Sequence, residues 1–373
     1  MWTEGAVFYT NMEIRMKKSL VALAVLGAFA AAASAQSSVT VYGIADIGLS
    51  RVDPKPGTVS EALTTTGIDA GNRNGNRLGF RGTEDLGGGL NAIFQLENGF
   101  SLDTGTLGQG GRLFGRQAYA GVSGAFGRIV AGRVAAFSSG TGAFDMFGDM
   151  DPFYTGYHTA GMQNTFSSAG SLRMDNAILW QSANMSGFRA GLGLSFRGDG
   201  SENPGGGGAN NTVQFAAVSF GSGPFYGAIT FDRFKQGEVA ADPVAKHLQI
   251  GATFDMKVVK LHGAYAQEDN FRGEIRVPGG AQATGSDASA IMLGVSVPLG
   301  AGKLLASVQK RDVDALGLVG QGDRKVFGLG YEYNLSRRTM VHGSYGARTD
   351  GGTMKTTTSG GQSQMVLGMT HFF

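Results

Sequence analysis

The chain has 373 residues, including 63 glycines and no cysteine, and a formal net charge of +2. The lack of cysteine excludes a disulfide scaffold, and the near-neutral balance gives no overall basic field for nucleic acid. Abundant glycine without a collagen period, interleaved with Val, Phe, Tyr and Leu, favours crowded strands and many turns.

The N-terminal residues predict export. Lys17-Lys18 precedes an apolar run at 20–33, and the small residues of 33–35 follow. This order is typical of a secretory signal peptide, and we expect cleavage after Ala35. The run is shorter than the roughly 20 apolar residues of a spanning helix, which disfavours an uncleaved anchor. Residues 1–35 are therefore interpreted as an N-terminal extension plus the signal peptide, with Met16 as the expected true start.

The mature chain, 36–373, reads as strands of roughly ten residues whose connections alternate between long and short. Long connections are expected near 53–76, 101–111, 136–172, 198–210, 234–244, 270–287, 312–322 and 349–361, and short ones near 85–89, 123–126, 184–187, 221–223, 255–257, 299–302 and 335–337. These connections join 16 strands. An even number of strands with short turns at one end and longer loops at the other is typical of single-chain outer-membrane barrels.

The two-residue apolar period fits a soluble sandwich as well as a membrane barrel. Three features favour the bilayer. Aromatic residues cluster near strand ends, the polar face carries charge and glycine that would fill a soluble core badly, and 16 strands are many for one sandwich. We therefore predict an all-β fold, a 16-stranded antiparallel transmembrane β-barrel. Terminal Phe373 is expected to close it against the first strand, because a lipid-exposed sheet cannot leave an open edge.

The connection 136–172 is the longest and shows no amphipathic period. Connections of this length are usually functional or disordered, and its Phe, Tyr and Met residues argue against disorder. We expect this third outer loop to fold into the barrel and narrow it. The alternative is an ordinary surface loop.

Charged residues on both sides of such a constriction are the candidate pore residues. They are Arg77, Arg81, Arg116 and Arg133 on the wall, and Asp145, Asp149 and Asp151 on the loop. Arg77 and Arg81 share a face opposite Leu78 and Phe80, and arginine facing lipid near the midplane costs roughly 2–4 kcal/mol. We therefore expect them to line water, with the loop acids opposite. The alternatives are solvated strand ends for the arginines, and an outer-surface cluster holding a divalent cation for the acids.

Several motifs resemble the general diffusion porins of Gram-negative outer membranes, specifically the beta-proteobacterial branch. They are Asn76–Gly87, Ala92–Phe100, Leu113–Val122, Phe126–Arg128 and the terminal Phe373. The resemblance runs from Ser38 to Phe373. It implies a homotrimer with the third loop as an eyelet facing an arginine ladder. The implied partners are outer-membrane lipid and lipopolysaccharide, permeating ions and small solutes, and the barrel-assembly machinery that would read the C-terminal strand.

The predicted function is thus an outer-membrane channel for passive diffusion, without cofactor, metal or catalytic residues. One alternative is a channel selective for anions or for particular solutes. Others are a blocked structural or adhesive barrel and an outer-membrane hydrolase. A hydrolase needs a base beside a nucleophile, and the five histidines are scattered outside any serine or metal motif.

Overall fold

A computed structural model describes residues 38–55, 63–154, 156–166, 172–196, 212–235, 244–271, 286–314, 323–350 and 361–373. The predicted extension and signal peptide, 1–35, lie outside the described residues. No helix among these residues is both long enough and apolar enough to cross a membrane.

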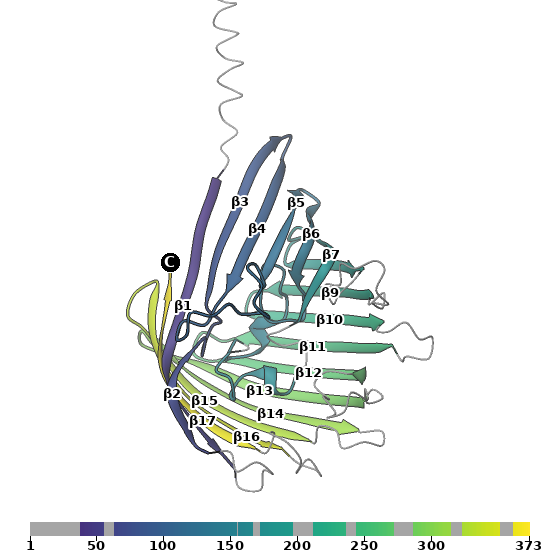
Figure 1. Ribbon diagram of the computed structural model, residues 1–373. Coiled ribbons are helices and arrows are strands. Elements are labelled where there is room, and N and C mark those ends of the chain that lie inside the picture. The colour runs from purple at the N-terminus through teal and green to yellow at the C-terminus, as the bar shows by residue number, and fades with distance from the viewer. Residues whose placement is uncertain are drawn as a thin grey trace, which may run out of the picture.

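The described residues form strands joined into one sheet, together with two single-turn 3₁₀ helices (Figure 1). The strands are β1 (Ser38–Pro54), β2 (Thr65–Ala70), β3 (Arg77–Gly87), β4 (Leu90–Gly99), β5 (Gln117–Gly124), β6 (Gly127–Ala135), β7 (Arg173–Gln181), β8 (Phe188–Ser195), β9 (Thr212–Ser222), β10 (Phe225–Lys235), β11 (Ala245–Asp255), β12 (Lys260–Phe271), β13 (Ser286–Leu299), β14 (Gly302–Asp314), β15 (Arg324–Asn334), β16 (Thr339–Asp350) and β17 (Gln362–Phe372). The 3₁₀ helices are η1 (Gly148–Met150) and η2 (Met162–Asn164).

The sheet closes on itself. β1 pairs antiparallel with β17 from Ile44 to Pro54, and with β2 and β3 along its other edge. The last residue completes the seam, because Gly43 and Phe373 exchange backbone hydrogen bonds of 3.0 and 3.1 Å. Closure pairs the backbone groups that an open edge would leave facing lipid. The predicted closed antiparallel barrel is confirmed.

β2 and β3 together occupy one position in the barrel wall, so 17 strands fill 16 positions. β2 pairs with residues 47–52 of β1, and β3 pairs with residues 38–44. The chain leaves the wall between them, at 71–76. The sequence reading treated 53–76 as one long polar loop. It missed β2 because Thr65–Ala70 is only six residues long.

Side chains alternate between the two faces of the wall. On β15, Phe327 and Leu329 are 43% and 42% exposed. Val326, on the opposite face of the same strand, is only 3% exposed. Exposed apolar side chains on successive outward positions are what a bilayer-facing surface requires. Inside, the apolar side chains gather between the 136–166 segment and the wall from β6 to β13. A second, smaller cluster packs Phe153, Tyr157 and Ala160 of this segment against Leu305 of β14.

Candidate pore constriction

The connection between β6 and β7 runs across the inside of the barrel (Figure 1). Its side chains reach distant strands. The Tyr157 hydroxyl donates to Glu332 of β15 at 2.9 Å, and the Thr159 hydroxyl donates to Gln364 of β17 at 3.0 Å. Arg311 of β14 donates to the Thr165 carbonyl at 2.8 Å. These contacts join the segment to strands on other parts of the wall. Residues 155 and 167–171 of the predicted loop lie outside the described residues.

Glycines on the inner wall make room for this segment. A Cβ on Gly191 would lie 2.3 Å from the Phe137 ring, and one on Gly328 would lie 2.8 Å from the Phe153 ring. Both distances are far shorter than side-chain contacts allow, and cores tolerate such overlap poorly. The glycine content noted in the sequence therefore serves close packing of loop against wall as well as turns.

The three loop acids occupy different environments. Asp145 accepts hydrogen bonds from the amides of Gly140, Phe147 and Gly148, at 2.9, 3.1 and 2.8 Å. Asp149 is exposed. Asp151 is 1% exposed and accepts from the Met162 amide at 2.7 Å, so it fastens the loop to itself.

The pKa of the Asp145 carboxyl group is raised above its ordinary value. Desolvation by the surrounding loop raises its pKa to about 6, against the opposing effect of the three amide bonds, and the nearby Asp149 carboxylate raises it further. Its charge therefore changes near neutral pH. Within the described residues, no three His, Asp or Glu side chains are grouped to hold a metal ion.

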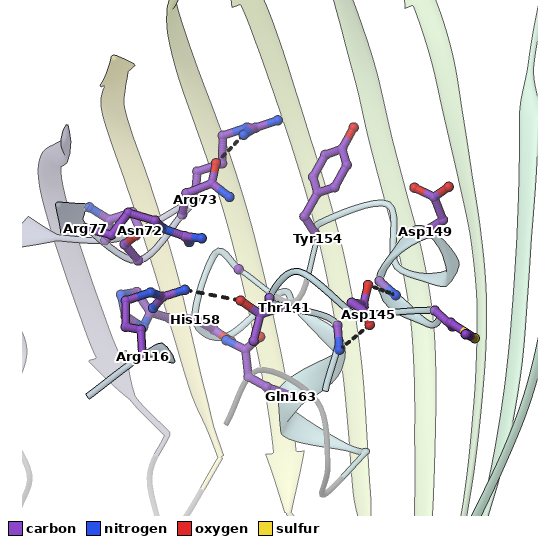
Figure 2. A pocket seen from close by; sticks show the side chains of 18 of the residues that line it. Asn72, Arg73, Arg77, Arg116, Thr141, Asp145, Asp149, Tyr154, His158 and Gln163 are labelled. Carbon is purple, nitrogen blue, oxygen red and sulfur yellow. Dashed lines mark hydrogen bonds between the residues drawn. The ribbon is translucent and has the colours of Figure 1, made fainter. Parts of the chain in front are cut away.

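A hollow of about 570 Å³ remains between loop and wall. Figure 2 shows Arg73, Arg77 and Arg116 on one side of it, with Asp145 and Asp149 on the other. Its charged lining residues are Arg73, Arg77, Arg116, Arg189, Asp145 and Asp149, and His158 also lines it. Of the candidates named from the sequence, Arg77, Arg116, Asp145 and Asp149 line this hollow, whereas Arg81, Arg133 and Asp151 do not.

Arg77 and Arg116 share one carboxylate. Arg116 Nε lies 2.7 Å from a Glu97 oxygen, and Arg77 lies 3.9 Å from the same oxygen. Glu97 is 2% exposed, and it also accepts from the Tyr42 hydroxyl at 2.8 Å. The cluster of Glu97 with Arg77 and Arg116 therefore keeps one net positive charge beside the hollow.

The remaining two wall arginines lie beyond the hollow. Arg81 is on the same face of β3 as Arg77, with its guanidinium 5.2 Å from the centre of the Tyr42 ring. Arg133 lies near the long-loop end of β6, where it meets Asp175 at 2.5 Å. Arg112 meets Asp175 at 2.7 Å. The cations thus follow the wall above and below the narrow part.

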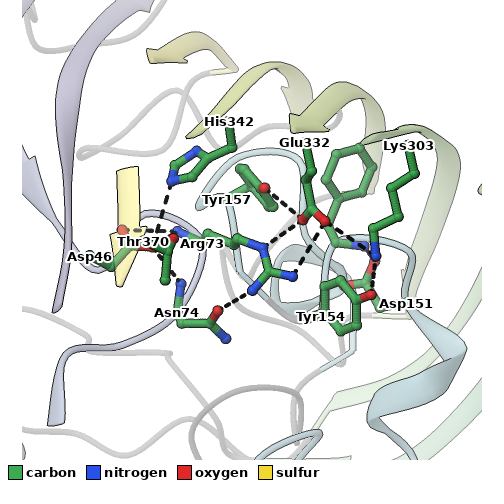
Figure 3. A network of polar contacts seen from close by, with 11 residues as sticks. Asp46, Arg73, Asn74, Asp151, Tyr154, Tyr157, Lys303, Glu332, His342 and Thr370 are labelled. Carbon is green, nitrogen blue, oxygen red and sulfur yellow. Dashed lines mark hydrogen bonds and ion pairs between the residues drawn. The ribbon is translucent and has the colours of Figure 1, made fainter. Parts of the chain in front are cut away.

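Arg73 was missed by sequence reasoning. It lies on the 71–76 turn, where Asp46 accepts from the amides of Arg73 and Asn74 at 3.3 and 3.2 Å (Figure 3). Its Nε lies 2.6 Å from Glu332, and its guanidinium lies 4.8 Å from the centre of the Tyr154 ring. The Asn- and Gly-rich turn around a single arginine was the available signal, but the sequence assigned it to an outer loop. Arg189 was also missed, because in the sequence it reads as an ordinary polar residue of a strand.

Comparison with known proteins gives the family. The chain matches the Gram-negative porin family over residues 22–353. An outer membrane porin of Bordetella pertussis is 38% identical, with 88% of this chain and 94% of that protein covered. Outer membrane porin protein 32 of Delftia acidovorans is 34% identical, with 88% of each covered.

The chain belongs to the Gram-negative porin family. The solved anion-selective porin from Comamonas acidovorans resembles this porin with a TM-score of 0.70 and 26% identity, over 91% of this chain and 100% of that one. The porin therefore lies in the outer membrane and forms a water-filled channel for passive diffusion of ions and small hydrophilic solutes, as predicted.

Proposed function

We propose that the hollow between the 136–166 segment and the arginine wall is the constriction of this channel, and that it favours anions over cations. The observation that carries the proposal is the lining itself. Four arginines and two aspartates line the hollow, and Arg73, Arg77 and Arg116 lie opposite the two aspartates. Charges that line a narrow aqueous slit set ion selectivity without tight binding.

The buried acids cancel only part of this positive charge. Glu97 pairs with Arg116 and Glu332 pairs with Arg73, and all four residues are less than 10% exposed, so Arg77 and Arg189 are the more open cations of the lining. Asp145, whose pKa is about 6, carries less than a full charge near neutral pH. The similar porin from Comamonas acidovorans is described as anion-selective, which also supports the proposal.

The test is the reversal potential of purified porin in a planar bilayer under a tenfold KCl gradient. We expect the reversal potential to have the sign that arises when chloride permeates faster than potassium. A potential of the opposite sign would refute anion preference, and the absence of steady conductance steps would favour a blocked barrel.

We further propose a homotrimer that sits among outer-membrane lipid and lipopolysaccharide, as the family resemblance implies. The aromatic end of β17 would be read by the barrel-assembly machinery. Resistance to dissociation in cold detergent, lost on heating, would support the trimer. Its relatives are porins, which are channels, so we propose no catalytic activity and no cofactor.

We propose that the signal peptide is cleaved after Ala35 during export. The first residue of the mature porin would then be Gln36. N-terminal sequencing of protein purified from outer membranes tests this proposal, and a sequence beginning upstream of Ala33 would contradict it.

A further inference from the structure

The outer face of the barrel carries a second hollow, of about 380 Å³, across β13, β14, β15 and β16. Most of its lining is apolar and faces away from the lumen. Leu293, Val308 and Phe327 are 58%, 54% and 43% exposed. Lys310 and Lys325 also line it. A membrane-facing hollow with two cations is not explained by the channel.

The strand register arranges these residues in two adjacent rows. Lys310 of β14 is directly opposite Lys325 of β15. In the next outward row toward the short turns, Val308 is opposite both Leu293 and Phe327. Directly opposed side chains have Cβ atoms about 4.5–5.5 Å apart, and like charges there repel. An anion between the two ammonium groups would remove that repulsion.

The lysine row lies near the membrane border on the long-loop side. Tyr331 and Tyr333, exposed on β15, lie where an aromatic girdle is expected on the short-turn side. Lys325 is eight residues from Tyr333, which corresponds to about 20 Å of membrane height for a strand tilted by roughly 40°. The apolar band of such barrels is about 25 Å tall. The two lysines therefore lie about 5 Å inside the far border of the band, where their long side chains can reach the head groups.

Acids lie on the loop side of the lysines. Lys310 Nζ is 2.7 Å from Asp312 Oδ2, and both side chains are about half exposed. Asp323 also acts on Lys310 electrostatically. Among the described residues, Lys325 has no carboxylate within 4 Å. The charge order from membrane to solvent is thus apolar, cationic and acidic, so an anion would enter from the lipid side.

We propose that this outer groove, formed by Leu293, Val308, Lys310, Lys325 and Phe327, binds a membrane lipid that carries a phosphate head group. An acyl chain lies on the row of Leu293, Val308 and Phe327. The phosphate lies between the two ammonium groups. Apolar contact and charge complementarity select an anionic lipid over a neutral one. The inference rests on the proposed position among outer-membrane lipids, but not on the selectivity of the constriction.

The experiment titrates folded porin in detergent with phosphatidic acid and counts bound lipid by native mass spectrometry. Diacylglycerol with the same chains and inorganic phosphate serve as the two partial ligands. We expect Lys325→Gln to weaken binding of phosphatidic acid about fivefold, with a larger loss in Lys310→Gln/Lys325→Gln. Neither partial ligand should match phosphatidic acid on the wild type.

The matched control is Lys257→Gln/Arg337→Gln, which removes two exposed cations from short turns. Its binding should equal that of the wild type. If the control lost as much phosphatidic acid binding as the lysine variants, the loss would follow net charge alone, and the proposed groove would be refuted. Displacement of phosphatidic acid by millimolar inorganic phosphate would indicate a free-anion site and also overturn it. Reversal potentials of all variants should stay unchanged, which separates this outcome from failure of the proposed constriction.

Discussion

Neutralising Arg77 and Arg81 together should move the channel toward cations. The two residues share the inner face of β3, one lining the hollow and the other beside Tyr42. Substitution by glutamine keeps their length and hydrogen-bonding groups while removing two positive charges. Glu97 keeps Arg116 at 2.7 Å, so the variant does not leave that buried acid without a cation.

The magnitude follows from Coulomb's law. A unit charge about 8 Å from a permeating ion in water contributes about 0.5 kcal/mol, reduced to about 0.2 kcal/mol by 0.1 M salt. Because anion and cation change in opposite directions, each arginine alters the anion-to-cation permeability ratio about twofold. The double variant should therefore change that ratio about fourfold.

The assay is the reversal potential in a tenfold KCl gradient. A fourfold change in permeability ratio shifts this potential by about 25 mV toward the cation side. The shift should shrink as salt rises, since screening weakens each charge. Lys257→Gln, which changes a charge on a short turn, is the control and should leave the potential unaltered. A shift of the same size in that control, or none in Arg77→Gln/Arg81→Gln, would refute the idea that these two arginines set the field in the slit.

Three further perturbations test the loop. Asp145 has a pKa raised to about 6, so lowering the pH from 7 to 5 should protonate it, remove a negative charge and increase anion preference; Asp145→Asn should abolish this change, and an unchanged pH profile would exclude Asp145 as its source. Deleting most of 142–161 should raise single-channel conductance while the trimer persists, and unchanged conductance would place the segment outside the conduction path. Arg311→Met removes the 2.5 Å partner of buried Glu268 but leaves His247 3.1 Å from it, so it should cost less than the roughly 3–5 kcal/mol of an uncompensated buried charge, seen as a lower melting temperature, with partial recovery in Glu268→Gln/Arg311→Met. Full stability of Arg311→Met would show that this pair does not anchor the loop.

The barrel was predictable because its pattern is local. Outward Phe327 and Leu329 alternate with inward residues along a strand, and each long connection lies between two such patterns. The break between β2 and β3 was not predictable from this period. Residues 71–76 leave the wall, and the chain then continues along the same edge of β1.

The constriction was only partly predictable, because its charges meet across long sequence separations. Arg77 was identified because it shares a strand face with Arg81, opposite Leu78 and Phe80. Arg73 depends on Glu332, 259 residues away, and no local pattern links them. Asp151 resembles its neighbour Asp149 in sequence, yet one is buried in loop hydrogen bonds and the other faces water. Spacing along the chain does not distinguish these two environments.

The sign of the wild-type reversal potential tests the central claim most directly. With purified porin in a planar bilayer, tenfold more KCl on one side and pH 7, an arginine-lined aqueous slit predicts steady conductance steps and a potential set by chloride. A potential set by potassium, or a folded barrel that passes no current, would contradict the account.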